Sequence, residues 1–128
     1  ITEKDMDFSK KHIVVTNKNN PKWENRSEYI SLWNKYNRKS SIDLGEALAI
    51  IPTGHYSGSS YTFQADFWYD SWESFLKNQK SLENSGPMSD DQKRMWDIDQ
   101  NHSDEITTFL GCTWASKGIP SKTFTIAK

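Results

Sequence analysis

Cysteine is almost absent from this chain of 128 residues, because Cys112 is its one thiol. A single cysteine excludes an internal disulfide framework and a cysteine-ligated zinc site. Long hydrophobic runs are also lacking, since none approaches the roughly 20 apolar residues that span a membrane. The formal net charge is -1, with the basic residues scattered among acids, whereas nucleic-acid-binding domains usually carry a basic stripe. We therefore expect neither a membrane nor a nucleic acid as a partner.

Aliphatic side chains are scarce as well. Leu, Ile, Val and Phe account for 24 of the 128 residues, just under the level of about 20% below which disorder becomes a concern. Six Trp, five Tyr and six Phe compensate, because one aromatic ring can bury roughly 150–250 Å². We expect a single folded domain over residues 1–128 with an aromatic-rich core, preceded at 1–11 by a loose polar arm.

The spacing of apolar residues predicts the order of the elements. Tyr29, Leu32, Trp33 and Tyr36 share one helical face, and residues 61–69 alternate strictly between two faces of a strand. Residues 84–121 are expected to be a helical insertion, with helices capped at Ser89 and at Ser103 or Asp104. The pattern predicts a strand at 12–16, a helix at 25–39, strands at 46–51 and 61–69, a helix from Asp70 to about residue 82, and a last strand at 123–127.

This β-α-β-β-α-β order predicts an α+β, ferredoxin-like sandwich with extra helices before the last strand. Right-handed crossovers place both long helices on one face of an antiparallel sheet, with the first and third strands in the middle. The order, together with the junction FWYDSWESF at 67–75, resembles the dimeric α/β-barrel superfamily, including antibiotic-biosynthesis monooxygenase-like and EthD-like proteins. The resemblance covers residues 12–82 and 122–127. It implies a homodimer whose two sheets meet across the faces that carry no helices, and no catalytic residue follows from it.

The face of the sheet opposite the helices, here called the second face, carries the first candidate site. It is too apolar for open water and too polar for an ordinary core, which indicates a cavity or a partner subunit. A carboxylate in a central strand is costly unless it is paired, hydrated or functional. Asp66 and His12 are therefore candidate general bases, and Gln64 and Trp68 are candidate ligand-binding residues. The alternative for Asp66 is a cross-strand partner such as a lysine or a threonine.

Two further candidates for ligand binding, His55 and Tyr56, lie in the expected hairpin loop, where a solvated turn is the alternative. None of the three histidines has the spacing of a metal-ligand pair. His102 follows Asp97 and Asp99, but a metal ion would need more converging ligands. We expect no metal and no organic cofactor.

Three functions remain open from the sequence. The first is a small-molecule-handling protein, in one form a cofactor-independent enzyme acting on a small hydrophobic or aromatic substrate. The second is a non-catalytic ligand-binding or structural homodimeric module. The third is a carbohydrate-binding domain that uses Trp23, Trp96 or Trp114. A cytoplasmic location is expected, although the start at Ile1 leaves a processed or exported form open.

Overall fold

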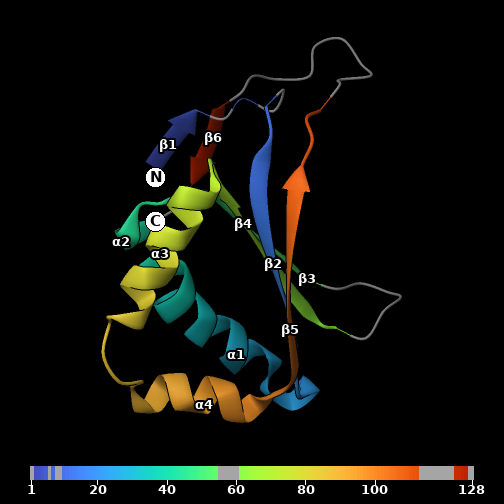
Figure 1. Ribbon diagram of the computed structural model, residues 1–128. Helices are drawn as coiled ribbons and strands as arrows, with labels where there is room; N and C mark the ends of the chain where they lie inside the picture. Colours follow the sequence, from blue (N-terminus) through green and yellow to red (C-terminus); the bar gives the residue numbers. More distant parts are fainter. Residues whose placement is uncertain (1, 6, 8–9, 55–60, 113–122, 127–128) are drawn as a thin grey trace.

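A four-stranded antiparallel sheet with helices packed on one face forms the centre of the computed structural model (Figure 1). The structure describes residues 2–5, 7, 10–54, 61–112 and 123–126. The strands are β1 Thr2–Asp5, β2 His12–Pro21, β3 Ala47–Gly54, β4 Phe63–Tyr69, β5 Asp99–Phe109 and β6 Thr123–Ile126. The helices are a 3₁₀ turn at Trp23–Asn25, α1 Arg26–Trp33, a π-helical turn at Asn34–Arg38, α2 Lys39–Leu44, α3 Trp72–Glu83 and α4 Asp90–Ile98.

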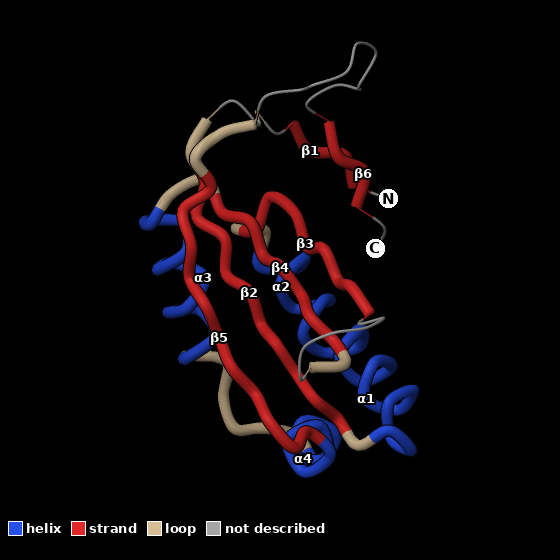
Figure 2. The backbone as a smooth tube through the Cα atoms, turned by 90° about the vertical axis from the view of Figure 1, so that its right-hand side faces the viewer, coloured by secondary structure: helices blue, strands red, loops and turns tan. Residues whose placement is uncertain are grey.

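The topology is that of an α+β ferredoxin-like sandwich, as the sequence predicted. The sheet order is β3-β4-β2-β5, so β2 and β4 are central and β3 and β5 form the edges. Helices α1 and α3 lie behind the sheet in Figure 2, and α4 crosses its end before the chain enters β5. Helix α4 is the extra helix before the last strand of the sheet. No helix in the described part of the chain is long and apolar enough to cross a membrane.

The prediction for residues 84–121 needs correction. Only α4 is helical in the described part of this range, and the expected helix at Ser103 or Asp104 is instead the strand β5. Strand β5 pairs with β2 from His12↔Phe109 to Pro21↔Asp99. It thus takes the place in the sheet that we assigned to 123–127. Main-chain pairing with a central strand outweighs a local capping signal, because the backbone groups of β2 that face away from β4 would otherwise lack a strand partner.

The ends of the chain also differ from the expectation. Residues Thr2–Asp5, expected in a loose arm, form β1 and pair antiparallel with β6, from Thr2↔Ile126 to Asp5↔Thr123. Residues 123–126 are therefore a strand, but one that lies outside the four-stranded sheet. The pairing joins opposite ends of the chain, so the local residue pattern at 1–11 contains no signal that predicts strand β1.

The expected helix at 25–39 runs further, through the π-helical turn and α2 to Leu44. Gly45 ends it with φ of 76°. That left-handed conformation suits glycine, which carries no Cβ.

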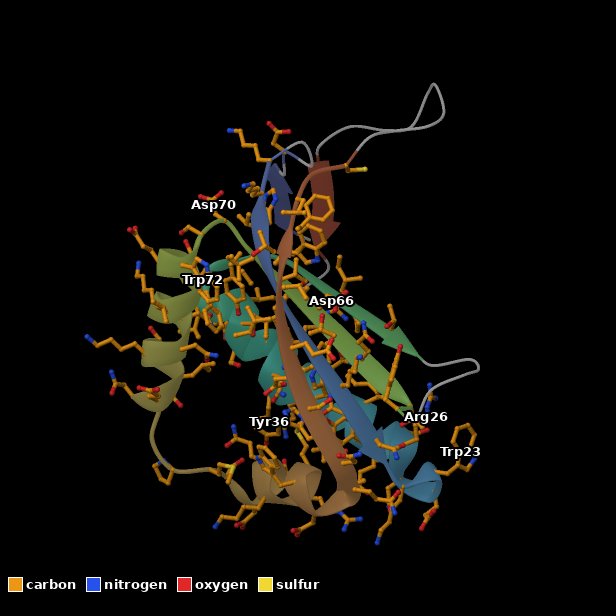
Figure 3. All side chains as sticks on the ribbon, turned by 45° about the vertical axis from the view of Figure 1, so that its right-hand side comes forward. Trp23, Arg26, Tyr36, Asp66, Asp70 and Trp72 are labelled. Atoms are coloured by element: carbon orange, nitrogen blue, oxygen red, sulfur yellow. The ribbon has the colours of Figure 1, made fainter. Side chains whose placement is uncertain are left out.

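An aromatic layer fills the space between the sheet and the helices, as predicted. The Trp33 ring lies edge-on to Phe63 at 5.0 Å, and Tyr69 lies edge-on to Phe75 at 5.5 Å. Trp33 is the most buried of these side chains, with 1% of its surface exposed. Trp72 was expected in the same layer. It lies at the start of α3 (Figure 3) with its ring 5.8 Å from that of Phe75, but 51% of its surface is exposed.

Candidate functional site

A cavity of about 390 Å³ lies between the sheet and the helices. Its apolar wall is made by core side chains that include Trp33, Phe67, Phe75 and Met95. Polar side chains from β2, β5, α2 and α3 complete the lining. Ligand sites in proteins usually combine apolar walls with a few placed polar groups in roughly 300–1,000 Å³. This cavity is therefore the candidate site, and it lies on the helix face of the sheet rather than on the second face.

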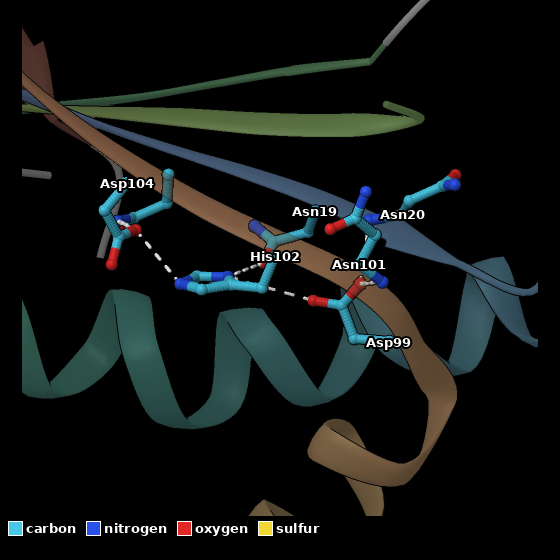
Figure 4. Close-up of polar contacts among 7 residues, drawn as sticks. Asn19, Asn20, Asp99, Asn101, His102 and Asp104 are labelled. Carbon is cyan, nitrogen blue, oxygen red and sulfur yellow. Dashed lines mark hydrogen bonds and ion pairs between the residues drawn. The ribbon is translucent and has the colours of Figure 1, made fainter. Parts of the chain in front are cut away.

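A polar cluster around His102 lines the cavity where β2 and β5 run side by side (Figure 4). His102 Nδ1 lies 2.6 Å from Asn19 Oδ1, and its Nε2 lies 3.0 Å from Asp104 Oδ1. Asn17 donates a hydrogen bond from Nδ2 to the same Asp104 oxygen. The Trp96 ring meets the imidazole edge-on, with 5.6 Å between ring centroids. These contacts fix the orientation of an imidazole that faces a carboxylate.

Asp99 is the buried carboxylate of this cluster, with 5% of its side chain exposed. Its Oδ1 accepts hydrogen bonds from the backbone N–H groups of Asn20 at 2.8 Å and Asn101 at 3.4 Å. Burial nevertheless raises the pKa of Asp99 above its usual range. The Tyr29 hydroxyl also hydrogen-bonds to Asp99, and burial beside this carboxylate raises the pKa of the Tyr29 phenol. His102 Nδ1 lies 3.9 Å from Asp99 Oδ2.

Asn78 brings a third polar group to the cavity, from α3. Only 2% of the surface of Asn78 is exposed, and its Oδ1 has no hydrogen-bond partner among the described residues. A buried acceptor without a donor is costly. A donor group in the cavity would meet this need if the Asn78 side chain turned its buried oxygen toward it.

The residues predicted from the sequence to form a site lie on the second face. Asp66 Oδ1 accepts hydrogen bonds from Thr16 Oγ1 at 2.7 Å and from Gln64 Nε2 at 3.3 Å, so a cross-strand threonine partners it. His12 is 4% exposed and its ring lies 5.8 Å from that of Trp68. The structure thus groups Gln64 with Asp66, and His12 with Trp68. Their proposed roles toward a ligand stay predictions.

The loop candidates His55 and Tyr56 lie outside the described residues. Among the tryptophans considered for carbohydrate binding, Trp23 is 76% and Trp96 59% exposed, while Trp114 is outside the described residues. Within the described ranges, no group of three or more His, Cys, Asp or Glu side chains is placed to hold a metal ion.

Strand β5 contributes three cavity residues that the sequence analysis did not assign to a site: Asp99, His102 and Asp104. His102 and Asp104 point to the same face because they are two residues apart in a strand, and they lie opposite Asn19 and Asn17 of β2. The matching spacing in the two segments was the available signal. It was hidden because residues 103 onward were predicted to be helical, which sends such side chains in different directions.

No protein-family profile and no curated protein matches this sequence. Solved structures do match, including a dimeric ferredoxin-like protein from an uncultured marine organism. The match covers 85% of this chain and 96% of that chain at 8% identity, with a TM-score of 0.63. The chain has the ferredoxin-like fold.

Two further matches extend the comparison. A NIPSNAP family protein from Agrobacterium tumefaciens strain C58 has a TM-score of 0.56 at 13% identity, over 75% of this chain and 90% of that one. An ethyl tert-butyl ether D (EthD) family protein from Bacillus halodurans C-125 has a TM-score of 0.52 at 10% identity, over 74% and 96%. The predicted resemblance to ferredoxin-like and EthD-like proteins is confirmed for the fold, and at these identities for the fold alone.

Proposed function

We propose that this protein binds a small, largely apolar molecule in the cavity between the sheet and the helices. The observation that carries the proposal is the composition of the cavity wall, in which buried rings such as Trp33 and Phe75 line the same cavity as the polar cluster around His102. Apolar walls supply affinity through the area that they bury, and a few polar groups fix the orientation of a ligand.

The test is a thermal-shift screen of small apolar and aromatic molecules, followed by calorimetry on the compounds that stabilise the protein. A ligand at 100 times its dissociation constant stabilises the folded state by about 2.7 kcal/mol. Ser40 of α2 lines the cavity and is half-buried, so Ser40→Phe should fill part of the space and reduce binding at least about tenfold, a loss of about 1.4 kcal/mol.

Ser31→Phe is the matched control, because Ser31 lies exposed on α1 and does not line the cavity. It should bind like the wild type. The proposal is rejected if no compound stabilises the wild-type protein, or if Ser40→Phe binds the compounds as tightly as Ser31→Phe does.

The polar cluster favours a second candidate function, which is cofactor-independent proton transfer on the bound molecule. An imidazole held against a carboxylate is the usual arrangement of a general base and the group that orients it. His102, 3.0 Å from Asp104, has this arrangement at the wall of the cavity. In the structure both ring nitrogens are engaged, Nδ1 with Asn19 Oδ1 and Nε2 with Asp104 Oδ1. With Nε2–H donating to Asp104, release of Nδ1 from Asn19 would free that nitrogen to remove a proton from an acidic C–H or O–H group of the ligand.

Exchange of solvent deuterium into the ligand, followed by nuclear magnetic resonance, tests this function. We expect His102→Gln to slow exchange by about 10²-fold or more while binding persists. Asp66→Asn and His12→Gln serve as controls, since both side chains lie on the second face. If either of these slows exchange and His102→Gln does not, the base lies on the second face, as the sequence analysis suggested.

We also propose that the protein is a homodimer joined through the second face. Three similar structures are described as dimeric ferredoxin-like proteins. In this chain the second face carries half-buried Trp68 and Phe109, with ring centroids 4.7 Å apart. A second copy would cover the parts of these rings that are still exposed. Under this proposal the second face serves assembly and the helix face serves the ligand.

A further inference from the structure

The geometry points to a preference of the cavity for one class of ligand: hydrophobic molecules that carry a cationic amine, with matched neutral molecules bound less well and carboxylates or phosphates rejected. This inference rests on the proposed ligand-binding function and specifies the charge of the ligand. It follows from the charges at the wall, from the unpaired acceptor of Asn78, and from the nature of the apolar surface.

The charged groups at the wall are of one sign apart from His102. Asp99 and Asp104 both line the cavity, whereas no lysine or arginine in the described part of the chain does so. Two carboxylates attract a cation and repel an anion, and the lower dielectric around the buried Asp99 strengthens its share of both effects. His102, between the two carboxylates, supplies at most one positive charge against two negative ones.

The group at the cavity wall that lacks a hydrogen-bond partner among the described residues is an acceptor. Asn78 is 2% exposed, lines the cavity from α3, and leaves its Oδ1 without a partner among the described residues. An ammonium group has three N–H donors and no acceptor, so it complements both this oxygen and the carboxylates. A carboxylate ligand offers acceptors only and complements neither.

The rest of the wall accepts the apolar part of such a ligand. Trp33, Phe67 and Phe75 present aromatic rings, and Met95 presents a flexible thioether. Aromatic faces bury flat hydrophobic groups and also attract cations. A volume of about 390 Å³ lies near the lower end of the range for ligand sites, which suits a compact aryl or alkyl amine.

Three molecules of nearly the same shape provide the test: tryptamine, its neutral alcohol analogue tryptophol, and indole-3-acetate. Their dissociation constants are measured by calorimetry near neutral pH. We expect tryptamine to bind at least about tenfold more tightly than indole-3-acetate, with tryptophol between them. Matched amine and acid pairs of any other scaffold found in the thermal-shift screen are compared in the same way.

Variants of the two carboxylates test whether the polar cluster around His102 causes the preference for amines. Asp104 is the more exposed of the two carboxylates. Asp104→Asn should weaken the binding of tryptamine about fivefold or more, because it removes one charge near the ammonium group. The binding of tryptophol, which is neutral, should stay nearly unchanged. Asp99→Asn should act in the same direction. Asp97→Asn is the control, because Asp97 is exposed on α4 and does not line the cavity.

An acid bound as tightly as its matched amine, or an amine unaffected by both cluster variants, overturns the inference while leaving the ligand-binding function standing. If neither these probes nor any screened compound stabilises the protein, the ligand-binding function itself fails. The two failures are therefore distinguishable.

Discussion

Asp99 couples the stability of the fold to pH. Burial raises its pKa in the folded protein. The ordinary pKa of aspartic acid is about 3.9. At pH values between this pKa and the raised one, the folded state therefore binds the proton more tightly than the unfolded chain does. The contribution of Asp99 to stability is therefore fully present below the ordinary pKa and is lost as the pH rises through the raised pKa. Relative to Asp99→Asn, the wild type should lose free energy of unfolding as the pH rises from about 4, the ordinary pKa of the group.

Urea unfolding of the wild type and Asp99→Asn at a series of pH values measures this loss. The difference between their free energies of unfolding cancels the titration of the groups that both proteins share. Asp97→Asn, on the exposed side of α4, is the matched control for removing a carboxylate outside the cluster. A wild-type minus Asp99→Asn difference that stays flat, or that rises with pH, would contradict the effect of burial on Asp99.

Individual residues were predictable where a single element decides their surroundings. The alternation at 61–69 correctly separates Ala65 and Phe67 in the core from Asp66 on the second face, and a cross-strand threonine was among the partners considered for that carboxylate. The groups at the cavity wall depend on which elements meet. Asn78 and His102 come together at one cavity only through the packing of α3 against the sheet and the pairing of β5 with β2.

Helix α4 begins with a capping box that the sequence already indicates. Ser89 Oγ accepts a hydrogen bond from the Gln92 N–H at 3.3 Å, and Gln92 Oε1 accepts one from the Ser89 N–H at 2.8 Å. Ser89→Ala removes the first of these bonds and should lower the free energy of unfolding by about 1 kcal/mol. The midpoint of urea unfolding should fall accordingly.

Ser31→Ala controls for the loss of a hydroxyl, because Ser31 is exposed on α1 and alanine favours a helix. It should leave stability unchanged within about 0.5 kcal/mol. If Ser89→Ala is equally neutral, the box contributes nothing to holding α4, whose Met95 and Trp96 form part of the cavity wall.

At the level of elements, local signals predicted helix starts better than strand partners. The box at Ser89 was placed correctly. The N-cap of α3 is Ser71, one residue after the expected Asp70, because the Ser71 side chain accepts the bond from the Ser74 N–H. Strand β5 was missed because most of its side chains are exposed on both faces, which leaves no apolar alternation to read. Its conformation is set by β2, more than eighty positions earlier in the chain.

The two proposals place ligand binding and dimerisation on opposite faces of one sheet. Helices cover one face and enclose the cavity there, while β1 and β6 lie near β3 at one end of the sheet. The second face remains partly open, with Asp66 half-buried and Thr107 of β5 exposed. An assembly through the second face would leave the cavity walls within each chain. Dimerisation and ligand binding should therefore be separable by mutation.

Thr107→Arg tests the proposed dimer. Thr107 lies opposite Val14 on β2, so its side chain is on the second face. An arginine without a partner in that interface should cost about 3 kcal/mol or more, which raises the dissociation constant of the dimer by about 100-fold. Sedimentation velocity over a concentration series should show the variant as a monomer where the wild type is a dimer, while ligand binding in the cavity is retained.

The neighbouring residue provides the control on the same strand. Thr108 is also exposed but lies opposite Ile13, on the helix face, because successive side chains of a strand point to opposite sides. Thr108→Arg should leave the dimer intact. If both arginine variants dissociate the protein, the edge of β5 rather than the second face joins the two copies. If the wild type is a monomer at every concentration, the homodimer is ruled out, and the partly open second face then belongs to the surface of a single chain.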